Sequence, residues 1–348
     1  MKDVRRFCWT FVVLTLALPA QTRFVILGDR TGETQGTVYA DIWKQIKKER
    51  PDFVLSVGDT IQGLNDDIAE PEWQAVETAV GPAWWKKLYL APGNHDIWSD
   101  ASQALFEKHA TRPRHYSFDQ GPVHVVVLDN SRSDQLAAGE LEFLESDLAH
   151  TAQPVKFVVS HRPSWLFNVM LRNSNSPVQK IAKRYGVQYV VAGHVHQMMY
   201  AELDGVRYIS MPSAGGHLRA SGKYEDGWFF GHAVVVVEEK EVKFEIRELG
   251  GRVSVPGDWG TAGLNAKVAF NQSMGSQLPD VIAELGQSVA VRPETKGGHD
   301  GLMNFGGTPA LSGVVQQNLH QAQDPSVVDL DSGELGFPHG HRQGQALE

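Results

Sequence analysis

Five short polar segments are the part of this sequence best suited to chemistry. They are, in chain order, Gly28-Asp29-Arg30-Thr31, Gly58-Asp59, Gly93-Asn94-His95-Asp96, Ser160-His161 and Gly193-His194-Val195-His196. Carboxylates, an amide oxygen and imidazoles together suit divalent or trivalent ions such as Mn, Fe, Zn or Ni, and the lack of thiols here argues against a soft metal. A carboxylate can also bridge two ions, and such a pair can bind a phosphate and activate a water. The segments therefore predict a metal centre that could bind a phosphate group and activate a water.

The spacing of the last segment supports chelation. His194 and His196 are two residues apart after an apolar run, and residues two apart in an extended segment face the same way. A lone Gly-Asp is more simply explained as a turn, because Asp bonds its own backbone there. Neither Asp29 nor Asp59 indicates a metal by itself, so the prediction depends on the ordered set of five segments.

Each polar segment directly follows a run of apolar, largely β-branched residues of strand length. In an open α/β sheet, ligands bind where the carboxyl ends of the strands meet the loops. These runs therefore predict the strands whose ends gather the site, and they are Phe24–Leu27, Phe53–Val57, Leu88–Ala91, Val155–Val159 and Val187–Ala192.

Helical patterns alternate with these runs. A helix over 38–50 is stopped by Pro51, and one over 176–185 begins with Ser176 as N-cap and Pro177 in its first turn. Further helices are expected over 71–87, 100–110 and 139–150. After the last polar segment, four antiparallel strands are expected to complete a second sheet, over 198–203, 206–211, 231–238 and 241–249.

The ordered motifs GD, GD, GNHD, H and GHxH resemble those of the calcineurin-like metallophosphoesterase superfamily, over residues 22–250. The resemblance implies an α/β fold, a four-layer α/β-β/α sandwich with two mixed sheets. It also implies a hydrolase that cleaves small phosphomonoesters or phosphodiesters by attack of a metal-bound hydroxide.

The same resemblance assigns roles to the polar residues. Two ions are implied, with Asp59 as the bridging carboxylate. His95 would protonate the leaving group, and Asp96 would orient and polarise the His95 ring. The remaining ligands are Asp29 and His196 at the first metal position, and Asn94, His161 and His194 at the second.

This sequence departs from the family pattern at the first metal position. The first motif of the family reads Asp-x-His, whereas here it reads Asp29-Arg30-Thr31. The Tyr that purple acid phosphatases carry three residues after the bridging Asp is Gln62 here. We therefore expect a weaker or more exchangeable first ion, with Thr31 or Gln62 donating an oxygen. Arg30 could hold a substrate phosphate bidentately.

Two alternatives follow from that departure. One is a mononuclear enzyme that uses only the second metal position. The other is a protein that keeps the scaffold, has lost efficient catalysis and acts in binding a phosphate ligand.

The N-terminus is typical of a secretory signal over residues 1–20. Positive charges at Lys2, Arg5 and Arg6 precede an apolar run at 7–18 and a small-residue cleavage site. We expect export to the periplasm or the extracellular space, with an uncleaved anchor as the alternative. The apolar run is shorter than the roughly 20 residues of a stable membrane span.

Composition sets the remaining expectations. The net charge of −9 disfavours nucleic-acid binding, which needs clustered Lys and Arg. The phosphoesterase domain is expected over 21–250, and 251–348 is expected to be a Gly- and Gln-rich, poorly structured extension.

Residues 163–176, which include Trp165, are hypothesised to form a lid over the leaving group. Arg162 could contact the phosphate or be a surface charge, and His217 reads as a loop histidine.

Overall fold

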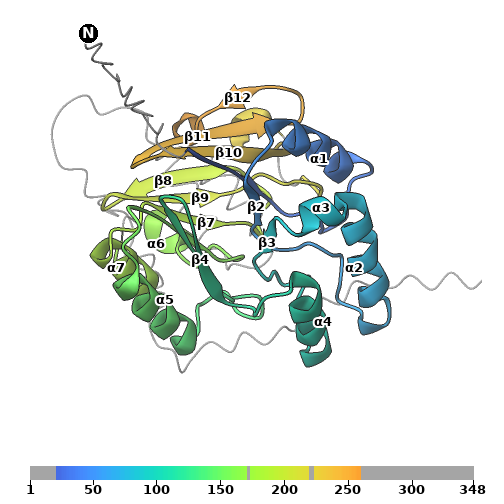
Figure 1. The fold of residues 1–348 in the computed structure, drawn as a ribbon, viewed down its shortest axis with the longest axis horizontal. Coiled ribbons are helices and arrows are strands. Elements are labelled where there is room, and N and C mark those ends of the chain that lie inside the picture. The colour runs from blue at the N-terminus through green and yellow to red at the C-terminus, as the bar shows by residue number, and fades with distance from the viewer. Residues whose placement is uncertain (1–20, 171–172, 219–222, 260–348) are drawn as a thin grey trace, which may run out of the picture. The chain divides into compact units, whose positions relative to one another are not determined.

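The computed structural model describes residues 21–170, 173–218 and 223–259. Two six-stranded mixed sheets pack face to face, and helices cover the outer face of each (Figure 1). The predicted four-layer sandwich is therefore confirmed. The expected signal segment 1–20 lies outside the described residues, as does most of the expected extension. The described fold continues past the expected boundary at residue 250.

The first sheet carries four helices on its outer side. Helices α1 (Val38–Glu49), α2 (Asp66–Val80), α3 (Pro82–Trp85) and α4 (Asp100–Ala110) lie together there (Figure 1). Strands β1, β2 and β3 are parallel, and β10 pairs antiparallel with β1. The strand order is β12 (Val253–Ser254), β11 (Glu241–Glu248), β10 (Gly231–Glu238), β1 (Thr22–Leu27), β2 (Phe53–Ser56) and β3 (Leu88–Leu90).

The second sheet is covered by α5 (Ala138–His150), α6 (Leu166–Met170) and α7 (Pro177–Arg184) (Figure 1). Strands β5, β6, β7 and β9 are parallel, and β4 and β8 pair antiparallel at the two edges. Short 3-10 turns occur at Tyr224–Asp226 and Pro256–Trp259. The strand order is β4 (Tyr116–Gln120), β5 (Val123–Val127), β6 (Val155–Val159), β7 (Tyr189–Ala192), β9 (Val206–Ser210) and β8 (Met199–Leu203).

Aromatic side chains join the two sheets. Alternation along β1 directs Phe24 and Ile26 between the sheets and Val25 toward the helices. The Phe24 ring meets Phe157 of the second sheet edge to face, with centroids 5.3 Å apart. Edge-to-face aromatic pairs contribute about 0.5–1.5 kcal/mol beyond their buried area. The sheets are thereby held in a defined relation, on which the position of their strand ends depends.

Helix boundaries follow the capping residues. The predicted cap at Ser176 is confirmed, because its hydroxyl accepts from the backbone N–H of Gln179 at 3.4 Å. The helix expected over 71–87 is instead two helices. The first begins earlier, where Asn65 Oδ1 accepts from the backbone N–H of Asp67, and it ends at Gly81 with φ of 89°.

The expected sheet is wrong for two strands. The strands over 231–238 and 241–249 join the first sheet as β10 and β11, and only β8 and β9 extend the second. The physical reason is that β10 is apolar on both faces, with Val235 between the sheets and Val234 toward the helices, so it needs a central place. The hairpin of β4 and β5 was not predicted, although Gly121-Pro122 separates two strand-length runs.

No helix in the described part of the chain is long and apolar enough to cross a membrane. The apolar run at 7–18, on which the expected export signal depends, lies outside that part.

A buried histidine fastens α5 to the edge of the second sheet. His124 Nδ1 lies 2.6 Å from Asp119 Oδ1, and its Nε2 lies 2.6 Å from Asp147 Oδ2 on α5. Carboxylates can only accept, so both ring nitrogens donate and the ring is an imidazolium. Burial opposes this charge, but the hydrogen bonds to Asp147 and Asp119 outweigh it and raise the pKa of His124.

The hydrogen bonds of charged His124 predict that the free energy of unfolding depends on pH. Because the pKa of folded His124 is raised above its unfolded value of about 6.5, its contribution is present below that pH and is lost as pH rises through the folded pKa. Asp147→Asn should lower the free energy of unfolding by roughly 1 kcal/mol at pH 6, allowing for solvent screening, and by less at pH 9. Urea unfolding at the two pH values measures this difference.

Glu145→Gln is the matched control on the same helix. Glu145 pairs with Arg184, whose charge does not change between pH 6 and pH 9. Glu145→Gln should therefore lower the free energy of unfolding by the same amount at both pH values. An equal cost for Asp147→Asn at both pH values would contradict the assignment.

Candidate metal centre

The five predicted segments meet at one edge of the sandwich. Their residues follow β1, β2 and β3 of the first sheet and β6 and β7 of the second, at the carboxyl ends of parallel strands. The structure brings two groups together, each with ligand atoms within 4.8 Å of one another. Asp59 belongs to both groups, as a bridging carboxylate must. The groups are Asp29, Asp59 and His196, and Asp59, His161 and His194.

The second metal position is built around His161, which is fully buried. Its Nδ1 donates to the carbonyl oxygen of Val57 at 2.9 Å, so Nε2 is the nitrogen left to face the site. That Nε2 lies 3.0 Å from Asn94 Oδ1 and 3.3 Å from Asp59 Oδ2. The His194 ring lies 5.1 Å from the His161 ring. Asn94, which the resemblance assigned here, therefore lies beside these ligands.

The first metal position gathers around Asp29, which is also fully buried. Asp29 Oδ2 accepts from the backbone N–H of His194 at 2.8 Å and lies 3.4 Å from His196 Nε2. The Nδ1 of His196 donates to the carbonyl oxygen of His217 at 2.9 Å, which orients Nε2 toward Asp29. His217 thus positions a candidate ligand through its backbone. No sequence pattern indicated this contact, because a carbonyl carries no residue-type signal.

The electrostatics of the site favour a bound cation. Burial opposes a charged ring, yet the carboxylates of Asp59 and Asp29 raise the pKa of His161 to about 9. For Asp59, burial is outweighed by the neighbouring histidines, chiefly His161, and its pKa is lowered. Burial and the positive charges of His161 and Arg162 hold the pKa of His194 well below its usual value, so it is neutral, the form that binds metals.

The backbone of the site is strained in three places. Asp59, His194 and His196 have φ values of 56°, 70° and 57°, in the left-handed region that residues with a Cβ rarely adopt. Such residues cost of order 1–3 kcal/mol each and collect at functional sites. All three residues belong to the two candidate ligand groups.

Two glycines allow the carboxylates to approach the chain closely. An ideal Cβ on Gly93 would lie 2.1 Å from Asp59 Oδ1, and one on Gly193 would lie 2.3 Å from Asp29 Oδ1. Any larger residue would fill the space that these carboxylates occupy. The requirement for glycine at both positions therefore follows from the site and not from a turn.

The residues present fit metal ions. Asp29 Oδ1 is buried, and no donor among the described residues reaches it. A buried carboxylate oxygen without a donor is costly unless a cation neutralises it. Carboxylates, an amide oxygen and imidazoles are ligands of borderline-hard ions. Asp29, Asp59 and His196 would hold one ion, and Asp59, Asn94, His161 and His194 would hold the other.

His95 lies beside the bridging carboxylate, but Asp96 does not orient it. The backbone N–H of His95 donates to Asp59 Oδ1 at 2.9 Å, and its Nδ1 donates to the carbonyl oxygen of Gln62 at 2.6 Å. The carboxylate of Asp96 instead accepts from the backbone N–H groups of Gly93, Thr60 and Ile61. The role predicted for Asp96 is therefore filled by Gln62, and Asp96 ties two site loops together.

Arg30 and Arg162 flank the site differently. The Arg30 guanidinium donates to the carbonyl oxygen of Thr60 at 3.1 Å and lies 5.5 Å from the ring centre of Tyr39. Arg162 follows His161 and pairs with exposed Asp134 at 2.6 Å. Phosphate binding by Arg30 stays a prediction, and Arg162 is the arginine whose charge acts on His194.

Trp165 does not line the site. Its side chain is 1% exposed and packs on Tyr208 of β9, with ring centres 5.3 Å apart. The hypothesis that it belongs to a lid over the leaving group is wrong for this residue, because its indole is buried against Tyr208 of the second sheet. Residues 171–172 of the hypothesised lid lie outside the described residues.

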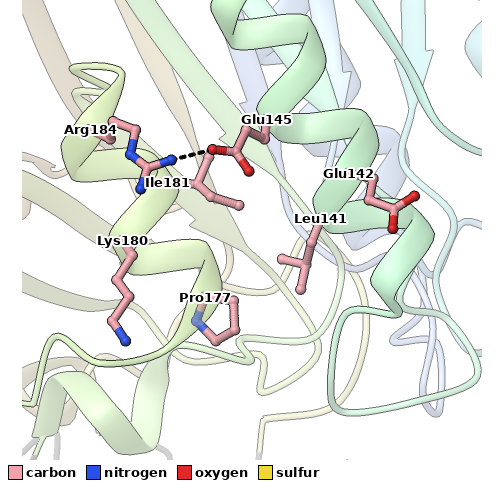
Figure 2. A pocket seen from close by; sticks show the side chains of 7 residues that line it. All are labelled: Leu141, Glu142, Glu145, Pro177, Lys180, Ile181 and Arg184. Atoms are coloured by element: carbon pink, nitrogen blue, oxygen red, sulfur yellow. Dashed lines mark hydrogen bonds and ion pairs between the residues drawn. The ribbon is translucent and has the colours of Figure 1, made fainter.

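A separate groove lies between α5 and α7, in the outer helical layer. It has a volume of about 260 Å³. Figure 2 shows Glu145 of α5 paired with Arg184 of α7 across it. It contains none of the predicted site residues. The side chains that line it are Leu141, Glu142, Glu145, Pro177, Lys180, Ile181 and Arg184.

Comparison with known families agrees with this geometry. The family model for calcineurin-like phosphoesterases matches residues 22–198, about half of the chain, and these residues include all five segments. The chain belongs to that family. The resemblance inferred from the motifs is thereby confirmed, and with it a hydrolase family that uses divalent metals on small phosphate esters.

Curated relatives of this chain have two kinds of name. The 3',5'-cyclic adenosine monophosphate phosphodiesterase CpdA of Haemophilus influenzae is 24% identical over 187 residues, which are 50% of this chain and 66% of that protein. Purple acid phosphatase 15 of Arabidopsis thaliana is 26% identical over 253 residues, 59% of this chain and 47% of that protein. The chain thus spans just under two thirds of the first and about half of the second.

A solved structure shares the fold of this chain. The purple acid phosphatase PPD1 from Lupinus luteus seeds aligns with a TM-score of 0.52 at 17% identity. The alignment covers 68% of this chain and 53% of that one. At this identity the likeness concerns the fold alone.

Metal binding should stabilise the protein through this site. Each Mn²⁺ ion, supplied at about 100 times its Kd, should add about 2.7 kcal/mol to the free energy of unfolding. Gly193→Ala should abolish the part of this gain that comes from the ion at the first position, because the new Cβ would displace Asp29. Thermal melting with Mn²⁺ and with EDTA measures the effect.

Gly139→Ala is the control for that substitution. Gly139 lies in α5, and an ideal Cβ there meets nothing within 4 Å. Alanine should be tolerated or stabilise the helix by up to about 1 kcal/mol, and the gain from Mn²⁺ should remain. If Gly193→Ala gained as much as wild type, the placement of the ion at Asp29 would be refuted.

Proposed function

We propose that this protein is an exported, metal-dependent phosphoesterase that hydrolyses small phosphomonoesters or phosphodiesters. The observation that carries the proposal is the shared carboxylate of Asp59, which lies within ligand distance of both groups of metal-binding side chains. Membership of the calcineurin-like phosphoesterase family supports it. Export rests on the charged and apolar pattern of residues 1–20.

Bound metal ions would hold the phosphate and lower the pKa of a water so that hydroxide attacks in line. The protein supplies the remaining parts of the reaction. Asp29 and Asp59 are buried and fixed by backbone N–H donors, so they place the charge of the site without reorganisation. Strand ends of both sheets hold the histidines.

His95 is the proposed general acid. Its Nδ1–H donates to the Gln62 carbonyl, so a second proton on Nε2 can be given to a departing alkoxide. The backbone bond from His95 to Asp59 keeps the ring beside the bridging carboxylate. Protonation of the leaving group matters most when that group is a poor one.

The relatives point to two substrate classes. The CpdA proteins are named as cyclic AMP phosphodiesterases, and the plant relative as a purple acid phosphatase. This chain lacks the His of the first motif and the Tyr of the purple acid phosphatases, since Thr31 and Gln62 stand there. Both substrate classes should therefore be assayed: monoesters, and diesters including a cyclic nucleotide.

The decisive experiment combines metal content with hydrolysis. Residues 21–348 should contain near two ions per chain by elemental analysis. They should also hydrolyse bis-p-nitrophenyl phosphate, p-nitrophenyl phosphate or cyclic AMP when Mn, Zn, Fe or Ni is supplied. One ion with turnover would favour the mononuclear enzyme. Absence of turnover with every metal would favour the phosphate-binding protein that the Thr31 substitution suggests.

His95→Ala tests the general acid. It should lower kcat by about 10²–10⁴-fold on an ester with an alkyl leaving group, and much less on a p-nitrophenyl ester, whose leaving group needs little protonation. Metal content should be unchanged, because His95 is in neither group of ligands. Equal losses on both substrates would contradict the role.

A further inference from the structure

We propose that the hydroxyl of Thr31, oriented by Gln62, is a ligand of the first metal position in place of an imidazole. The inference rests on the proposed metal centre and concerns which atoms complete it. It makes the first position rich in oxygen and therefore different in metal preference from the second.

The backbone places Thr31 beside the loops of two ligands of the first position. Its side chain is fully buried, and its N–H donates to the carbonyl oxygen of Asp59 at 3.2 Å. The next residue, Gly32, lies close to His196, since an ideal Cβ on Gly32 would be 2.8 Å from His196 Cε1. Thr31 also follows Asp29 by two residues. Its immediate surroundings are thus the loops that carry all three ligands of that position.

The direction of one hydrogen bond decides what the hydroxyl can do. Thr31 Oγ1 lies 2.5 Å from Gln62 Oε1, and the backbone N–H of Glu33 approaches the same Oε1 at 3.3 Å. An atom that receives a backbone N–H is an acceptor, so it is the amide oxygen and Thr31 donates to it. The only hydroxyl proton is then used. The hydroxyl oxygen keeps its lone pairs, and these can bind a cation.

Hydrogen bonds hold both the backbone and the side chain of Gln62 in place. Its backbone carbonyl accepts from His95 Nδ1 at 2.6 Å, and its side chain accepts from Thr31 and Glu33. A partner outside the ligand set that orients a ligand is a recurring feature of metal sites. One residue thereby connects the first metal position to the proposed general acid.

The two positions then differ in donor type. The first has three oxygens, from Asp29, Asp59 and Thr31, and one nitrogen from His196. The second has two oxygens and two nitrogens. Oxygen donors suit harder ions such as Mn²⁺, and imidazole suits Zn²⁺. We infer that the first position discriminates less in favour of Zn²⁺ over Mn²⁺ than the second does.

Thr31→Val and Thr31→Ser test the ligand. Valine has the shape of threonine without the hydroxyl, whereas serine keeps it. Isothermal titration with Mn²⁺ alone should show two ions in wild type and in Thr31→Ser. In Thr31→Val one ion should bind at least about 10-fold more weakly, and the other should be unchanged. Gln62→Leu should weaken the same ion, and Gln62→Glu, which keeps an acceptor oxygen, should weaken it less.

Several results separate this inference from the proposed function. If Thr31→Val binds both Mn²⁺ ions as wild type does, the inference is overturned and the phosphoesterase proposal stands. If wild type binds one ion and hydrolyses esters, the inference is again overturned. If wild type binds none and has no turnover, the proposed function itself fails. Melting in EDTA checks that the variants fold, and Gln62→Leu carries the test if Thr31→Val does not fold.

Discussion

The structure depends on two carboxylates that are buried side by side at the edge of the sandwich. Asp29 and Asp59 are 0% and 2% exposed, and one oxygen of Asp29 has no donor among the described residues. Buried negative charge of this kind is unfavourable unless positive charge is supplied. Without an ion, a proton on His161 supplies part of it, as the raised pKa of that histidine indicates. Bound cations would replace that proton and supply the full charge, so the chemistry of the protein and the stability of this edge share one cause.

The packing of the two sheets makes that arrangement possible. Asp29 and Asp59 follow strands of the first sheet, whereas the histidines after β6 and β7 come from the second. The site therefore exists only while the sheets keep their relation, which aromatic contacts such as Phe24 with Phe157 maintain. Backbone strain at Asp59, His194 and His196 is the cost of turning these side chains toward one another.

Gln62 connects parts of the site that a motif treats separately. Its carbonyl holds the His95 ring, and its amide oxygen holds the Thr31 hydroxyl. In the sequence it stands out only because it replaces an expected tyrosine. Asp96 shows the converse, because its place beside His95 in the chain suggested a contact, whereas its carboxylate binds backbone N–H groups of neighbouring loops. Adjacency in sequence does not decide which way a side chain turns.

The sequence by itself determined the strands before the five motifs, the family, and which residue types could bind metal, because hydrophobic periodicity and ligand chemistry are local properties. Tertiary structure decided the rest. Strand β10 lies beside β1 because it is apolar on both faces, and a pattern of alternation does not say which sheet will receive such a strand. Trp165 is buried because its indole packs on Tyr208 of the second sheet. Partners far apart in the chain, such as Thr31 with Gln62 or His196 with His217, depend on how loops meet in space, which no local pattern encodes.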